Sequence, residues 1–219
     1  MPFGFLKRRG HDQATRSPGG SGGAPPDAGH VDTAHLHQGG QRGVGFTALT
    51  EDWRLRGRMV IAGRLSDALN KREAIAITDV TWGAPGAATL DAAPGLKSVD
   101  PYVLILVTAG EDSLPPLSET EHAALKVHKV PYDVALEVPP FHIVGTVFMH
   151  PGSEPDSLLA RSTDMFLPVT EAVARLGELT VSEADVDVIL VNRFYLRGVE
   201  QVDKRTGQPH QKLPGSPYA

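Results

Sequence analysis

The sequence contains no cysteine among its 219 residues. This absence excludes disulfide bonds, cysteine-ligated zinc, iron–sulfur clusters and a thiol nucleophile. No apolar run approaches the ~20 residues that a membrane-spanning helix requires. The N-terminus also lacks the long apolar core of a signal peptide, and its charges follow its apolar residues rather than precede them. We therefore predict a cytoplasmic protein.

The sequence also lacks the common catalytic and cofactor motifs. It has no phosphate-binding Gly-x-x-x-x-Gly-Lys-Ser/Thr loop, no Gly-x-Ser-x-Gly elbow and no His-Glu-x-x-His helix. His30, His35 and His37 are close in sequence, but no carboxylate cluster completes a metal site with them. We predict no catalytic residues, no cofactor and no metal.

Charge is distributed unevenly along the chain. Residues 1–43 hold five basic and three acidic side chains, whereas the remainder holds 16 basic and 23 acidic ones. The body therefore has a net charge of −7, and phosphate backbones supply most of the affinity of nucleic-acid binding. The negative charge of the body therefore disfavours nucleic acid as a partner.

The first 43 residues contain ten glycines and four prolines and few apolar side chains. This composition predicts a flexible linker over residues 10–43, because too little apolar area is available to offset the entropy of ordering. Residues 1–9 precede the linker and combine apolar and basic side chains, which predicts a recruitment peptide that binds a protein partner or weakly contacts a membrane surface. Its candidate partner-binding residues are Phe3, Phe5, Leu6, Lys7, Arg8 and Arg9. The alternative is a frayed terminus without function.

The body contains blocks that resemble one another in the same order. Residues 53–61 match 141–149, 64–70 match 155–161, 74–80 match 166–172, and 102–107 match 186–191. The first block alternates apolar and polar side chains as a half-buried strand does, and its glycine indicates a bulge, a bend or a close backbone approach. In the second block Leu65 and Leu69 have helical spacing. We predict a tandem duplication of a small unit.

These units predict an α+β fold that is mostly β, with each copy running strand, short helix, strand, strand. The copies would be SH3-like or Sm-like barrels packed as a pseudo-dimer. We place the first repeat at 44–118, the second at 119–202 and a polar C-terminal tail at 203–219. Units of this size are marginally stable alone, so a shared core is expected.

Part of each copy is similar to small bacterial proteins of unknown function. The segments that carry the resemblance are Arg64-Leu65-Ser66-Asp67-Ala68-Leu69-Asn70 and the strand 75–80 that follows, with 166–172 and 190–193 in the second copy. The second copy lacks the Arg-Leu-Ser-Asp-x-Leu-Asn form. The excess of arginine over lysine, with frequent Ala, Gly and Pro, also fits a bacterial genome rich in G and C. The resemblance implies no activity.

Two groups of polar residues are candidate sites. Arg64, Ser66, Asp67 and Asn70 form a polar cluster in the repeat turn, beside Thr78 and Asp79. The competing interpretation is that Ser66 and Asp67 only start the helix. Arg193, Phe194, Tyr195 and Arg197 interleave basic and aromatic side chains on a predicted strand that runs on toward Val202, as an interaction face or a single-stranded nucleic-acid surface.

From these features we predict a non-catalytic protein-binding accessory or scaffold module that is recruited through its N-terminal peptide. Its partner is a protein, and self-association is possible. The first alternative is an Sm-like nucleic-acid-binding protein that uses residues 193–197. The second is an enzyme with a polar pocket that converges on Asp67 and Asp79.

Overall fold

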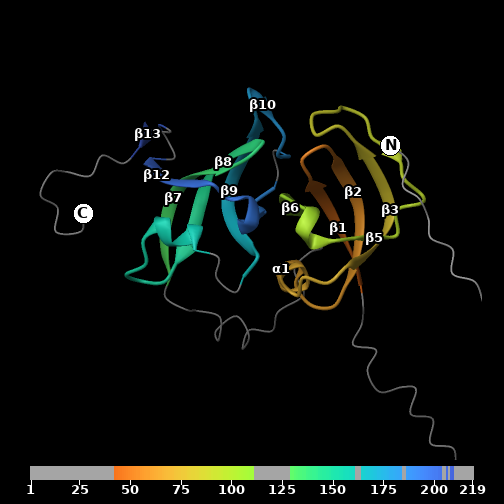
Figure 1. The fold of residues 1–219 in the computed structure, drawn as a ribbon, viewed down its shortest axis with the longest axis horizontal. Coiled ribbons are helices and arrows are strands. Elements are labelled where there is room, and N and C mark those ends of the chain that lie inside the picture. The colour runs from red at the N-terminus through yellow and green to blue at the C-terminus, as the bar shows by residue number, and fades with distance from the viewer. Residues whose placement is uncertain are drawn as a thin grey trace, which may run out of the picture. The chain divides into compact units, whose positions relative to one another are not determined.

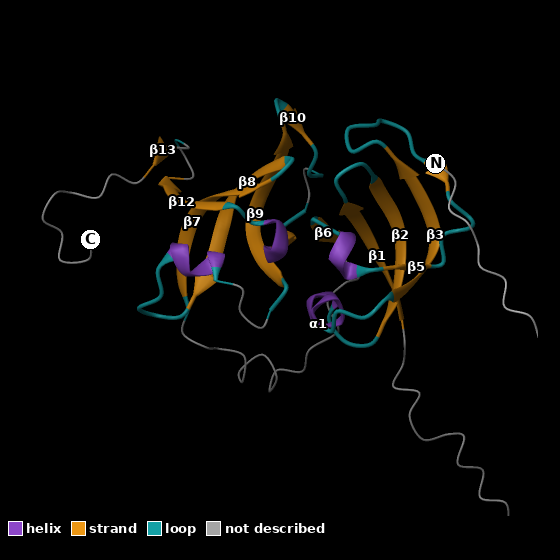
Figure 2. Ribbon diagram, in the orientation of Figure 1, coloured by secondary structure: helices purple, strands orange, loops and turns teal. Residues whose placement is uncertain are grey.

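The computed structural model describes residues 42–110, 129–160, 164–183, 186–203, 206 and 208–209. All of these residues belong to one compact unit. Strands dominate it, with a single short α-helix and brief 3-10 turns within the described ranges (Figures 1 and 2). This confirms the predicted β-rich α+β class. No helix in these ranges is long and apolar enough to cross a membrane.

The first half of the fold is an antiparallel meander with short additions. Its elements are β1 (Arg42–Leu49), β2 (Arg54–Ile61), α1 (Leu65–Asn70), β3 (Ile75–Gly83), β4 (Asp91–Ala92), β5 (Ser98–Val99), η2 (Pro101–Val103) and β6 (Leu106–Ala109). Strand β2 lies between β1 and β3, β5 pairs with the start of β3, and β6 returns to pair with β1. The strand order is therefore β6-β1-β2-β3-β5.

The second half uses the same order of pairing. Its elements are β7 (Val130–Val138), β8 (Phe141–Met149), η4 (Pro155–Leu159), β9 (Phe166–Leu176), β10 (Leu179–Thr180), β11 (Val188–Asn192), η5 (Arg193–Tyr195), β12 (Gly198–Asp203) and β13 (Gln208–Pro209). Strand β8 lies between β7 and β9, β11 pairs with β9, and β12 returns to β7. The order is β12-β7-β8-β9-β11.

Strand β6 pairs antiparallel with β11 and so joins the two halves in one sheet. We call this pairing, with the contacts that η2, η5 and the start of β9 make around it, the junction. The described strands form an open path from β13 to β4, so their pairings do not close either half into a separate barrel. Each hydrophobic core also contains residues of the other half. Met165, Phe166 and Leu190 pack in the first core, and Leu49, Ile105 and Leu106 pack in the second.

One glycine in each half sits at a β-bulge, as the sequence predicts. The register of β2 with β3 shifts at Gly57, and that of β8 with β9 shifts at Gly145. A Cβ atom at Gly57 would lie 2.8 Å from the carbonyl oxygen of Thr78. The strand opposite each bulge contains a residue with positive φ, Asp79 at 54° and Glu171 at 48°. A close backbone approach therefore requires glycine at both positions.

The structure corrects three sequence predictions. Strand β1 begins at Arg42 and pairs Gly43 with Val60, so these two residues lie in a strand of the body and not in the linker predicted over 10–43. The match of 102–107 with 186–191 is wrong, because β6 pairs with β1 whereas β11 pairs with β9. The strand predicted to continue toward Val202 is interrupted by η5, because the side chain of Asn192 accepts a hydrogen bond from the Phe194 N–H and caps a helical turn.

Candidate functional site

A groove of about 1140 Å³ opens beside the junction. Its lining comes from β1, β2 and β3, from the first turn of α1, from the end of β6, and from β9 and β11 with the loop before β11. Arginine and threonine side chains of the first half and acidic side chains of the second half line this groove together.

A polar row crosses the sheet within the groove. Arg56 lies opposite Thr47 on one side and Thr81 on the other, and Thr47 lies opposite Thr108. Residues that face each other across antiparallel strands point to the same side of the sheet. The Thr81 and Thr108 hydroxyls donate to backbone carbonyls of Arg56 and Thr47, at 3.4 and 3.2 Å. The exposed Arg56 guanidinium is therefore the group that this row offers to a ligand.

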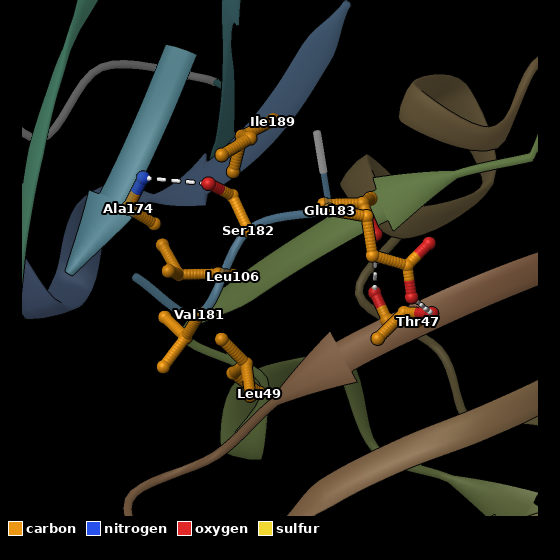
Figure 3. Close-up of a pocket in the computed structure, with 9 residues that line it drawn as sticks. Thr47, Leu49, Leu106, Ala174, Val181, Ser182, Glu183 and Ile189 are labelled. Carbon is orange, nitrogen blue, oxygen red and sulfur yellow. Dashed lines mark hydrogen bonds between the residues drawn. The ribbon is translucent and has the colours of Figure 1, made fainter. Parts of the chain in front are cut away.

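Glu183 lines the groove from the second half and is fixed by contacts to the first. Its Oε1 atom lies 2.9 Å from Arg54 Nη2. The same atom accepts a hydrogen bond of 3.3 Å from the Thr47 hydroxyl (Figure 3). A small cavity of about 10 Å³ lies directly beside it, lined mainly by Leu106, Val181 and Ile189. That volume holds about one water molecule, so the small cavity is no ligand site.

The rest of the groove combines apolar and charged surface. Pro168 is an exposed apolar residue of its lining, and Val186 and Val188 are partly exposed ones, whereas Phe46, Leu65 and Leu190 are buried in the first core. Two exposed acids, Asp79 and Asp187, lie along it with the arginines. The groove thus offers apolar contact together with both signs of charge.

The predicted polar cluster in the repeat turn is divided by the fold. Arg64 and Ser66 line the groove, as does Asp79. Asp67 is exposed in the first turn of α1 and accepts a 3.5 Å hydrogen bond from the Ser66 hydroxyl. Asn70 instead faces the junction, where its Oδ1 atom accepts a 2.8 Å hydrogen bond from the Phe166 N–H. The cluster does not converge on Asp67 and Asp79 as one pocket.

Residues 193–197 form part of the junction rather than a strand face. Phe194 packs against Tyr102 with ring centroids 5.7 Å apart, and the Tyr195 hydroxyl donates a hydrogen bond of 3.1 Å to the Tyr102 carbonyl. Burial lowers the pKa of Arg193, and the attraction of Asp164 acts against this shift. Arg197 is the exposed member of the group. Phe194 and Tyr195 instead contact Tyr102 of the first half and so help to join the two halves.

The most buried polar residue of the described chain, Asn192, had no functional prediction. Its side chain is fully buried, and Nδ2 donates to the Leu104 carbonyl at 2.7 Å and to the Pro101 carbonyl at 3.4 Å. The sequence signal was an asparagine directly after an apolar strand. The Arg54–Glu183 ion pair was also missed, because no local pattern links two residues so far apart.

The described residues include the histidines His142 and His150 and many acidic side chains. They contain no group of three or more His, Asp or Glu side chains that could hold a metal ion. His142 lies opposite Glu137 in the β7–β8 hairpin, with Nε2 and Oε1 3.5 Å apart. Both side chains are exposed to solvent, which favours a surface ion pair over a general base.

The predicted recruitment peptide, Phe3 to Arg9, lies outside the described residues. The evidence for a site therefore comes from the groove and the junction. No protein-family model matches the chain, and no curated protein or solved structure was found to be similar to it.

Proposed function

We propose that the chain is a non-catalytic protein-binding module whose groove holds an extended segment of a partner protein. The observation that carries this proposal is the open groove beside the junction, with its apolar lining and its two signs of charge. In this proposal the N-terminal peptide recruits the module in the cytoplasm and the groove binds the partner.

The size and lining of the groove favour a peptide over a small molecule. Small-molecule pockets usually enclose ~300–1,000 Å³ and converge on a few polar groups. This groove is larger, and its polar groups lie in a row along the sheet rather than around one point. An extended peptide can lie along such a row, because every second side chain of an extended segment points to the same side and can contact it.

The charge of the groove favours protein over nucleic acid. Its lining holds three acids, Asp79, Glu183 and Asp187, and as many arginines, so it lacks the excess of positive charge that binds a phosphate backbone. The segment that we considered for nucleic-acid binding, residues 193–197, contributes mainly to the junction. An acidic side chain of a peptide can contact Arg56 while a basic one contacts Asp187.

The proposal can be tested with a phage-displayed library of random short peptides, selected on the full-length protein. We expect enriched peptides that combine apolar residues with at least one acidic residue. Arg56→Glu should weaken their binding about five- to tenfold, because it replaces an attraction with a repulsion. The dissociation constants are measured by fluorescence anisotropy with the enriched peptides.

Arg175→Glu is the matched control. Arg175 is also an exposed arginine within a strand, opposite His142 and Thr180, and it is not part of the groove lining. Equal weakening by both variants would show that only overall charge matters and would contradict the proposal. Failure of the library to yield any specific peptide would also contradict it.

A further inference from the structure

Two strands near the ends of the sheet, β12 and β5, are counterparts of β6 and β11, the two strands that pair at the junction. Strand β12 follows η5 and pairs with β7 just as β6 follows η2 and pairs with β1. The Arg197 N–H donates to the Glu137 carbonyl at 2.8 Å, and the Ile105 N–H donates to the Leu49 carbonyl at the same distance. Strand β5 likewise pairs with the start of β3 as β11 pairs with the start of β9.

The junction fixes how such strands meet. Leu106 lies opposite Val191, and Val107 opposite Leu190, while the Asn192 N–H donates to the Ile105 carbonyl. Among the described strands, β5 pairs with β3 alone, and residues 198–201 of β12 pair with β7 alone. Both strands therefore expose backbone donors and acceptors along an outer edge.

We propose that these two edges pair between two copies of this chain, β12 of one copy with β5 of the next, in the register of the junction. That register places Val99 opposite Gly198 and Ser98 opposite Val199. It also brings together two pairs of opposite charge, Lys97 with Glu200 and Asp100 with Arg197, one on each face of the strand pair. All four charged side chains are exposed in the single chain.

Exposed apolar groups beside β5 support the same contact. Tyr102 and Val103 of η2 are 45% and 48% exposed. Their counterparts in η5, Phe194 and Tyr195, are partly buried at the junction. A second copy seated on β5 would cover Tyr102 and Val103 in the same way.

The contact between copies differs from the junction in strength. Met165 and Phe166 anchor the second half in the first core, but the corresponding positions before β3 hold the exposed residues Glu73 and Ala74. Asp100 also lacks the amide donor with which Asn192 binds the Leu104 carbonyl. Assembly is therefore reversible, because it has no counterpart of the Met165 and Phe166 anchors, and it is weakened by salt, because two exposed charge pairs contribute to it. It is a head-to-tail contact, which uses different surfaces on the two copies.

Cysteine cross-linking tests the register directly, because the natural chain has no cysteine. Full-length Ser98→Cys and Val199→Cys proteins are mixed and oxidised. Opposite residues of antiparallel strands have Cα atoms ~4.5–5.5 Å apart, which a disulfide can bridge. We expect the mixture to form a disulfide-linked dimer at least several-fold faster than either protein alone.

In the control mixture, the Ser98→Cys protein is oxidised together with a Val173→Cys protein instead of the Val199→Cys protein. Val173 is an exposed valine of β9 that belongs to neither edge. If Ser98→Cys alone cross-links as fast as the mixture, the contact is symmetric and the proposal is wrong. If the control mixture reacts as fast as the test mixture, the reaction is collisional and the proposal is also wrong.

Charge reversal provides a second test that does not depend on cysteine. Lys97→Glu and Glu200→Lys should each weaken self-association about three- to tenfold in sedimentation velocity, and the double variant should regain most of the loss. Lys71→Glu with Glu178→Lys makes the same charge changes away from both edges and should have no effect.

A natural chain that stays monomeric at every concentration would overturn the proposal. Arg56→Glu should leave assembly unchanged, so this result is separate from that of the groove.

Discussion

Asn192 links the two halves through its backbone N–H and its side-chain amide nitrogen. Its backbone N–H donates to Ile105, its amide nitrogen donates to the Leu104 and Pro101 carbonyls, and its amide oxygen accepts from the Phe194 N–H. A fully buried polar side chain is tolerated only when it is satisfied in this way. The counterpart residue, Asp100, caps η2 with the same geometry but is exposed.

Asn192→Asp should destabilise the protein in a pH-dependent manner. The new carboxylate would face two carbonyl oxygens without a donor of its own, so its pKa in the folded state would rise above the unfolded value of about 3.9. The unfolding free energy of the variant relative to that of the natural protein is then greatest below about pH 4, where the new carboxyl group is protonated in both states. This relative free energy falls as the pH rises. We expect a loss of about 3 kcal/mol at pH 7, measured by urea unfolding at several pH values.

Asp100→Asn is the control for that substitution. It keeps a capping oxygen at an exposed position and should change the unfolding free energy by less than about 0.5 kcal/mol. A loss at Asn192→Asp that is the same at pH 4 and pH 7 would show that the carboxylate charge is not its cause.

At the level of elements, the start of β9 determines whether the two halves are independent. Phe166 belongs by sequence to the second half but is buried in the first core. Its backbone N–H is bound by Asn70 at the end of α1. Strand β6 makes the reverse exchange, since Ile105 and Leu106 pack in the second core. Neither half can unfold without exposing apolar surface of the other.

Phe166→Ala should therefore destabilise both halves by about 3–5 kcal/mol, the usual cost of removing a buried phenylalanine. Both tryptophans, Trp53 and Trp82, lie in the first half and stack with ring centroids 4.8 Å apart. In this variant, the unfolding midpoint measured by tryptophan fluorescence in the first half should fall to a lower denaturant concentration. The midpoint measured by hydrogen exchange in β7 and β8 should fall to the same concentration. Phe148→Ala, at an exposed position, should have a much smaller effect. Separate midpoints for the two halves would contradict this view of the junction.

At the scale of the whole molecule, the proposed activities occupy separate places. The groove lies beside the junction, and the two outer strand edges lie at β5 and β12. The recruitment peptide is expected at residues 1–9. Binding, assembly and recruitment can therefore be removed one at a time.

Deletion of residues 1–9 should abolish recruitment without changing the folded body. Three apolar side chains and three cations bind only weakly and reversibly, so we propose cross-linking the full-length and shortened proteins in host lysate before capture. We expect a specific partner, or the membrane-bound fraction, to be lost with the peptide. The groove-binding peptides and the unfolding midpoint should be unchanged. Capture of the same partners by both proteins would show that the peptide is incidental.

Local features of the fold could be predicted from the sequence. The alternation in 53–61 and 141–149 predicts β2 and β8, and the spacing of Leu65 and Leu69 predicts α1. The glycines at 57 and 145 indicated a bulge, a bend or a close backbone approach. The structure shows bulges there, and a close backbone approach demands glycine whichever strand lies opposite. The duplication itself stays a prediction. Two of its four blocks lie in strands that hold the same place in the strand order of each half, and a third lies in the helical turn between those strands.

By itself, therefore, the sequence determined the β-rich class, the bulged strands and the helical turn. The tertiary structure alone decided that β6 pairs with β11, that Asn192 is buried between the halves, and that residues 193–197 join them instead of forming an open face. It also decided which members of the Arg64–Asn70 cluster reach the groove. The physical reason is that periodicity reports how buried a side chain is. The identity of its neighbour depends on strand pairing between residues far apart in the chain, which no local pattern encodes.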